Sequence, residues 1–131
     1  MKKVIITGMV SLMIMIVAQG CYKVATVQID NSPAVTKTVS FKTDIIPIIS
    51  KNCALPGCHN SGGRAPVLQA DNAYISLSSG NYLNKSTPSK SIIYLWLTGK
   101  EAVAMPMGAE NNPSNINALV LAWIIQGAKN N

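Results

Sequence analysis

The sequence predicts an all-α domain of three to five helices, and two observations lead to this expectation. Apolar residues recur at spacings of three and four over residues 41–52 and again over residues 114–126, which is the period of a helix with one buried face. The stretches between these segments are rich in glycine, proline, serine and asparagine, as loops are. We therefore expect a small helical domain over residues 39–131, preceded by segments of a different kind.

The composition limits what such a domain can be. The chain has 131 residues, which is enough for one small domain after a targeting segment. With one Phe, two Trp and four Tyr, it has few aromatic side chains for a self-sufficient core. The formal net charge is +6, but the lysines are scattered, so nucleic acid is not an expected partner. A basic surface of this kind serves solvation, or else attracts an acidic partner protein.

Residues 1–20 predict a signal peptide. Two lysines precede the apolar residues 4–18, a length that suits a secretory signal and falls short of the ~20 residues that a membrane span needs. The following Ala18-Gln-Gly-Cys21 resembles the lipobox of bacterial lipoproteins, in which the cysteine is lipidated and becomes the first mature residue. We expect Cys21 to anchor the protein to a membrane through its lipid chains. An ordinary cleaved secretory signal and an uncleaved anchor are the alternatives.

Residues 21–38 show no helical period and predict a tether between the lipid and the domain. The first helix is expected over Phe41–Asn52, with Thr43 or Asp44 as its N-cap. If Asp44 is the cap, Pro47 falls in the first turn, where its missing N–H would have no helical partner. The proline is therefore compatible with the helix.

Two shorter elements are expected in the middle of the domain. Residues Asp71–Leu77 predict a short helix. Residues Ser89–Thr98 predict another, with Ser89 or Ser91 as its N-cap. Because residues 92–97 are all apolar, a buried strand fits them as well, and periodicity does not decide between the two.

The last helix is expected over Ser114–Gln126. Asn112 or Ser114 is its expected N-cap, and Gly127 is placed to end it. One face of this helix is apolar and predicts burial in the core: Ile116, Leu119, Val120, Trp123 and Ile124.

The residues with the most distinctive chemistry lie in Lys51–Asn60. Within it, Cys53, Cys58 and His59 form a Cys-x4-Cys-His pattern, and His59 is the only histidine of the chain. The usual haem attachment signature is Cys-x-x-Cys-His, in which two thiols bond the porphyrin edge and the adjacent histidine binds the iron. This chain has the same parts with two more residues between the thiols.

With its surroundings, this stretch resembles a class I, cytochrome c-like haem domain of the type found in bacterial outer-membrane lipoproteins. The resemblance covers roughly residues 39–129. Its specific parts are the Cys-His stretch and the ending Trp123-Ile-Ile-Gln-Gly-Ala128, and the spacing between the thiols is its departure. Supporting segments are Ser40–Ile49, Ala65-Pro66 and Met105-Pro106.

The resemblance implies a fold of three to five helices around one covalent haem c. Cys53 and Cys58 would hold it by thioethers, and His59 would be the proximal iron ligand. The carbonyl of Pro66 would accept a hydrogen bond from His59 Nδ1–H and so orient the ring. Met105, in a Met-Pro pair, matches the distal ligand.

Met107 is the rival for the distal position. These two methionines are the only ones outside the predicted signal, since Met1, Met9, Met13 and Met15 belong to it. Methionine is therefore not simply a filler of the core in this chain.

In function, the resemblance implies an electron carrier whose iron cycles between the ferric and ferrous states, and not an enzyme acting alone. The expected partners are redox proteins of the cell envelope. The expected location is the envelope, anchored at Cys21, at the outer membrane facing the periplasm or at the cell surface.

Three alternatives remain open at this stage. A Cys53–Cys58 disulfide in a non-haem exported lipoprotein would make the chain a binding or structural module. A zinc site would need four ligands, and Cys53, Cys58 and His59 supply three. A five-coordinate haem would suit a gas sensor or a peroxidase, if neither methionine reached the iron.

Overall fold

The computed structural model describes residues 34–101, 104–107 and 114–131. These residues form helices and loops and contain no strand, which confirms the prediction of an all-α domain for this part of the chain. The predicted signal peptide, Cys21 and most of the predicted tether lie outside the described residues. In chain order the elements are the π-helical turn η1 (Phe41–Ile45), α2 (Ile46–Asn52), α3 (Ala70–Ser79), the 3₁₀ turn η2 (Pro88–Lys90), α4 (Ile92–Leu97) and α5 (Ser114–Ile125).

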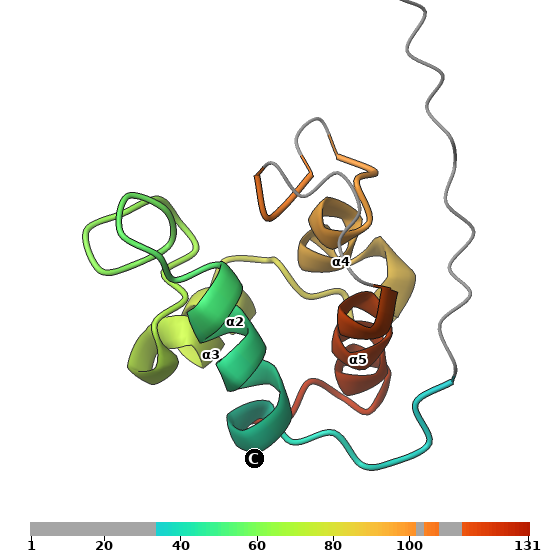
Figure 1. The fold of residues 1–131 in the computed structure, drawn as a ribbon. Coiled ribbons are helices and arrows are strands. Elements are labelled where there is room, and N and C mark those ends of the chain that lie inside the picture. The colour runs from blue at the N-terminus through green and yellow to red at the C-terminus, as the bar shows by residue number, and fades with distance from the viewer. Residues whose placement is uncertain (1–33, 102–103, 108–113) are drawn as a thin grey trace, which may run out of the picture.

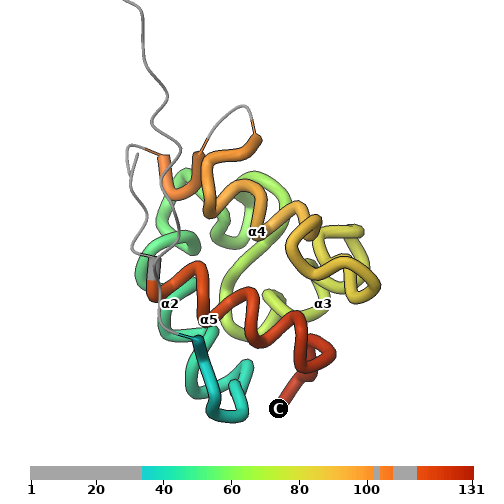
Figure 2. Tube along the Cα trace, turned by 90° about the vertical axis from the view of Figure 1, so that its right-hand side faces the viewer, coloured from blue at the N-terminus to red at the C-terminus, as the bar shows by residue number. Residues whose placement is uncertain are grey.

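The helices form two groups around a shared core. Figure 1 shows α2 beside α3 in one group and α4 beside α5 in the other. In Figure 2, which is turned by 90°, α4 and α5 face the viewer and α2 and α3 lie behind them. The helix α5 also contacts η1, so the last helix closes the core against the first. No helix among the described residues has the length and apolar character to cross a membrane.

The first helix forms where it was expected, but its cap is a different residue. Neither Thr43 nor Asp44 is the N-cap: Ser40 is, and its Oγ accepts a hydrogen bond from Thr43 N–H at 3.2 Å. Asp44 reaches back instead, and its Oδ2 accepts from Ser40 N–H at 2.8 Å. The two side chains therefore accept from two backbone N–H groups at the start of the helix, Ser40 Oγ from Thr43 and Asp44 Oδ2 from Ser40, in the manner of a capping box. Pro47 lies in the first turn of α2, where it interrupts no helix.

Asp44 makes the stability of this helix start dependent on pH. The hydrogen bond from Lys37 Nζ, at 2.5 Å, and then the bond from Ser40 N–H hold the pKa of the Asp44 carboxyl below its usual value. A carboxyl with a lowered folded pKa contributes stability above its unfolded pKa, near 4, and loses it as pH falls through the folded pKa.

We therefore expect Asp44→Asn to lose less stability than the parent protein between pH 7 and pH 3. The asparagine cannot titrate, whereas protonation of Asp44 weakens both of its bonds. Urea unfolding at the two pH values measures the difference. An equal loss in both proteins would show that Asp44 has no part in the acid sensitivity.

The middle segment is helical in both places where a helix was considered. The helix α3 covers the predicted Asp71–Leu77 and extends it at both ends, and α4 is a helix and not a strand. Ser91 stands directly before α4, as predicted, but its hydroxyl does not cap the helix. It is fully buried and accepts from Asn84 N–H at 2.9 Å, so it holds the preceding loop against the domain.

The last helix ends as the sequence predicts. Gly127 has φ of +100°, and its N–H bonds to Ile124 O at 2.9 Å. The next N–H, of Ala128, bonds to Trp123 O at 2.9 Å, which completes a Schellman motif. Ser114 is the first residue of α5, and the other candidate cap, Asn112, lies outside the described residues.

The core joins α5 to the start of the domain. The Trp123 ring lies 4.9 Å from the ring of Phe41, and Phe41 meets Tyr74 edge to face at 5.4 Å. Gln126 holds the junction between the predicted tether and the domain: its Oε1 accepts from Val39 N–H at 2.8 Å, and its Nε2 donates to Lys37 O at 3.0 Å. The buried core comprises Val39, Phe41, Ile45, Ile49, Leu68, Ala73, Leu77, Leu97, Val120, Trp123, Ile124 and Ala128.

Candidate functional site

An apolar cavity of about 320 Å³ lies between α2, the loop after it, α4 and the start of α5. A volume of this size is typical of sites for small molecules and cofactors. A second cavity, of about 300 Å³, opens beside Val39 and Trp123 and holds none of the predicted site residues. The aliphatic wall of the first cavity consists of Ile48, Ile49, Leu55, Leu68, Ile93, Leu97, Ile116 and Val120.

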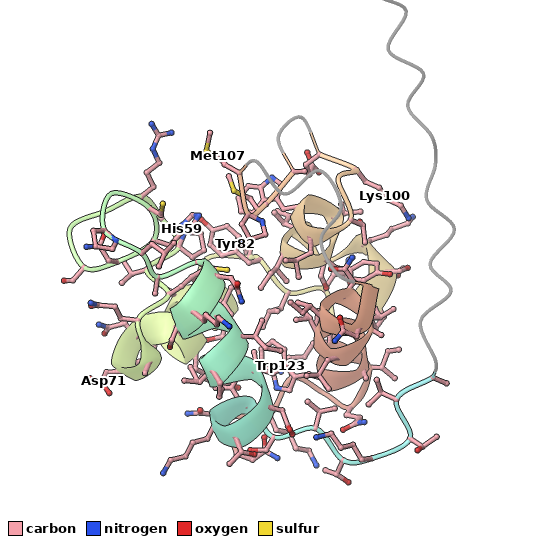
Figure 3. The ribbon with its side chains drawn as sticks, viewed as in Figure 1. His59, Asp71, Tyr82, Lys100, Met107 and Trp123 are labelled. Atoms are coloured by element: carbon pink, nitrogen blue, oxygen red, sulfur yellow. The ribbon has the colours of Figure 1, made fainter. Side chains whose placement is uncertain are left out.

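The structure brings every predicted site residue in its described part to this one cavity. Four of them come from the loop between α2 and α3, and two from the segment between α4 and α5. They are Cys53, Cys58, His59, Pro66, Met105 and Met107. In Figure 3 the labelled His59 and Met107 lie at the same end of the molecule, with Tyr82 beside them.

The His59 ring is oriented through its Nδ1 atom. Nδ1 lies 3.0 Å from Pro66 O, which is the hydrogen bond that the sequence led us to expect, and 3.1 Å from Arg64 O. Carbonyl oxygens only accept, so Nδ1 must carry the proton. In the neutral ring, the lone pair is then on Nε2, which is the atom left to bind a metal.

Backbone hydrogen bonds hold the loop that carries the two thiols. His59 N–H bonds to Cys53 O at 3.1 Å, so the residues between them form a closed loop. Cys58 N–H bonds to Leu55 O at 3.0 Å and turns the chain inside that loop. The two additional residues of the Cys-x4-Cys-His pattern are accommodated in this turn, and Cys53 stays next to the histidine in space.

The second half of the loop packs closely against the first. Arg64 N–H bonds to Cys58 O at 2.8 Å, and Leu68 N–H bonds to His59 O at 2.7 Å. A Cβ atom placed on Gly63 would lie 2.3 Å from Cys58 O, so only glycine fits at that position. Backbone hydrogen bonds therefore hold the chain on both sides of His59.

The two thiols differ in environment. Cys53 is half-buried, Cys58 is exposed, and both are free, so the disulfide of the alternative interpretation is not formed in this structure. Burial, followed by the nearby Cys58, raises the pKa of the Cys53 thiol to about 11. Cys53 is consequently a neutral thiol at physiological pH.

We expect iodoacetamide to modify Cys58 at least about tenfold faster than Cys53 at pH 8 in the cofactor-free chain. The thiolate is the reactive form, and only about one Cys53 in a thousand is ionised three pH units below its pKa. Timed alkylation followed by peptide mass spectrometry gives both rates. Equal rates would contradict the burial of Cys53.

The two methionines also differ in environment. Met105 is half-buried, and its N–H bonds to Trp96 O at 3.0 Å, which fixes the chain there to the end of α4. Met107 has 75% of its surface exposed, and in Figure 3 its side chain reaches outward. Met105 is therefore the better placed of the two to present its sulfur to the cavity.

No family model, curated protein or solved structure matches the chain.

The function must therefore be inferred from the cavity and from the side chains in it that can bind a metal. Among the described residues, no three His, Cys, Asp or Glu side chains are grouped so as to hold a metal ion by themselves. The zinc alternative thus gains no complete ligand set from this part of the chain. The cavity offers instead two thiols, one imidazole nitrogen and two thioethers, on an apolar wall.

Two aromatic side chains complete the wall. Tyr82 and Trp96 both line the cavity, with ring centroids 5.8 Å apart. The two aromatic residues of α4 have different places: Tyr94 is buried and Trp96 lines the cavity. Tyr82 was not predicted, because it stands in a polar loop without a periodic pattern around it.

Proposed function

We propose that the chain is a lipid-anchored monohaem c-type cytochrome that transfers electrons in the cell envelope. The observation that carries the proposal is that Cys53, Cys58, His59 and Met105 all line the same apolar cavity. These four side chains are the set that a covalent haem with histidine and methionine ligands requires.

The residues of the cavity fit such a group. The Sγ atoms of Cys53 and Cys58 would form the thioethers, and His59 Nε2 and Met105 Sδ would be the ligands of the iron. The fit is supported by the proton on His59 Nδ1, which leaves Nε2 as the ligand atom. The aliphatic wall would cover the porphyrin and keep water from it.

When bound, haem iron supplies a one-electron couple between the ferric and ferrous states. The protein residues set the conditions for that couple. Pro66 O accepts a hydrogen bond from His59 Nδ1–H and fixes the direction of the ring. The Met105 thioether would favour the ferrous state, and iron held by both His59 and Met105 would offer no position to a substrate. These roles suit electron transfer between partner redox proteins.

Carbon monoxide binding separates this proposal from the five-coordinate haem sensor. The protein is produced in cells that carry the cytochrome c maturation machinery, purified, reduced with dithionite and exposed to the gas. We expect reversible reduction and oxidation and no spectral change with carbon monoxide, because both axial positions are occupied. Immediate formation of a carbonyl complex by the whole sample would contradict the electron-carrier proposal and favour the sensor.

The lipid anchor is the other part of the proposal, and it rests on sequence alone, since Cys21 lies outside the described residues. We expect the parent protein to carry acyl chains on Cys21, and Cys21→Ser to carry none and to keep residues 1–20, because the lipobox cysteine is both the lipidated residue and the first residue after the cut. The mass of the N-terminal peptide measures both changes. An unlipidated Cys21 in the parent protein would contradict the anchor.

A further inference from the structure

We propose that Ser76 is a positioning residue for His59 and acts on it through one peptide group. Ser76 belongs to α3, and its Oγ accepts a hydrogen bond from Val67 N–H at 3.0 Å. The carbonyl of that same peptide group is Pro66 O, which lies 3.0 Å from His59 Nδ1. A chain of two hydrogen bonds therefore runs from the serine hydroxyl through a single amide to the imidazole ring.

The first effect of Ser76 is to fix the direction of the Pro66 carbonyl. A peptide group is planar, so a bond that holds its N–H also holds its C=O. His59 Nδ1 has a second acceptor in reach, Arg64 O at 3.1 Å, on an exposed stretch of the loop. With its N–H held by Ser76, the Pro66–Val67 peptide keeps Pro66 O directed at the ring.

The second effect is electronic. An amide whose N–H donates a hydrogen bond is polarised, and its oxygen becomes a stronger acceptor. The Ser76 bond thus strengthens the bond from His59 Nδ1–H to Pro66 O and makes the ring a better donor at Nε2.

The helix that carries Ser76 is well fixed. Its neighbours Ala73 and Leu77 are fully buried in the core, so α3 cannot shift easily relative to the rest of the domain. Pro66 and Leu68, on either side of Val67, are buried as well. The chain of hydrogen bonds therefore connects the rigid core to the His59 ring.

Resting on the proposed function, the inference also predicts in which direction the balance between ferrous and ferric iron shifts when Ser76 is changed. A more strongly donating imidazole favours ferric iron. Removal of the Ser76 hydroxyl should accordingly shift the ferrous-to-ferric ratio at a fixed ambient potential about threefold toward ferrous iron, a change of the size that one weakened hydrogen bond produces.

The test compares Ser76→Ala with Ser79→Ala. Ser79 stands on the same helix, and its Oγ donates to the helix carbonyl of Ile75, at 2.6 Å. The readout is the NMR signal of the His59 Nδ1 proton in the protein as purified, in the ferrous state if it carries haem. We expect this proton to exchange with water about tenfold faster in Ser76→Ala and at the parent rate in Ser79→Ala.

A second pair covers the case in which Ser76→Ala does not fold. Threonine keeps the hydroxyl at this position, and valine has nearly the same shape as threonine but no hydroxyl. Of Ser76→Thr and Ser76→Val, only the valine variant should therefore speed the exchange. An unchanged exchange rate in both Ser76→Ala and Ser76→Val, or an equal change in Ser79→Ala, overturns the inference. A colourless protein would remove the proposed function, while the exchange rates would still decide the role of Ser76.

Discussion

Replacement of Trp123 by alanine is expected to lower the free energy of unfolding by about 3–5 kcal/mol. The side chain is 1% exposed, and its ring lies 4.9 Å from that of Phe41, at the place where the last helix meets the first. Its Nε1–H also donates to Lys129 O at 2.9 Å, so the substitution removes a hydrogen bond together with the largest fully buried side chain of the described core.

Such a loss is a large part of the ~5–15 kcal/mol that stabilises a typical domain. Urea unfolding followed by circular dichroism measures it. The matched control is Ile125→Ala on the same helix, which is 65% exposed and should change the free energy by no more than about 0.5 kcal/mol. Similar values for the two variants would mean that Trp123 is not the contact that joins α5 to the start of the domain.

Replacement of Met105 by alanine is expected to remove the weak long-wavelength absorption band that methionine ligation gives to ferric haem. Met105 is the half-buried methionine of the cavity, and its backbone is held by Trp96 O at 3.0 Å. Because the Met105 thioether would favour the ferrous state as an iron ligand, its removal should lower the reduction potential as well.

The matched control for this prediction is Met107→Ala, two residues away on the same loop. Its side chain is 75% exposed, and its removal should leave both the band and the potential unchanged. The opposite pattern would assign the distal position to Met107. Retention of the band in both single variants would exclude each of them as a required ligand.

The helices were predictable where a periodic pattern and a strong end signal coincide. Over residues 114–126 the apolar spacing gave the buried face, and Gly127 gave the end, because a positive φ of +100° suits glycine. For residues 92–97 the period was uninformative, since six apolar residues in a row satisfy a helix and a strand equally. Tertiary packing against α5 decides that segment.

The N-cap of the first helix was mispredicted for a local reason. Thr43 and Asp44 are both good caps, and the pattern places them near the start of the apolar period. The first turn is π-helical and begins earlier, at Phe41, so that Ser40 becomes the cap and Asp44 its partner. A wider first turn of this kind has no sequence signature that we recognised.

The candidate site was predictable from residue types but not from geometry. A lone histidine after a cysteine and a Met-Pro pair were enough to single out His59 and Met105. The places of Tyr82 and Ser76 depend on how the loops 53–68 and 80–91 fold onto α3 and α4. Such contacts between distant segments leave no mark on a single sequence.

The most direct test of the account is the mass of the polypeptide after denaturation and acid–acetone extraction of the matured protein. We expect one haem to stay bound to each chain. We also expect Cys53→Ser and Cys58→Ser each to lose one of the two attachments, and the double variant to lose the haem altogether. A protein that leaves this extraction colourless, with Cys53 and Cys58 still free to react with iodoacetamide, would contradict the account.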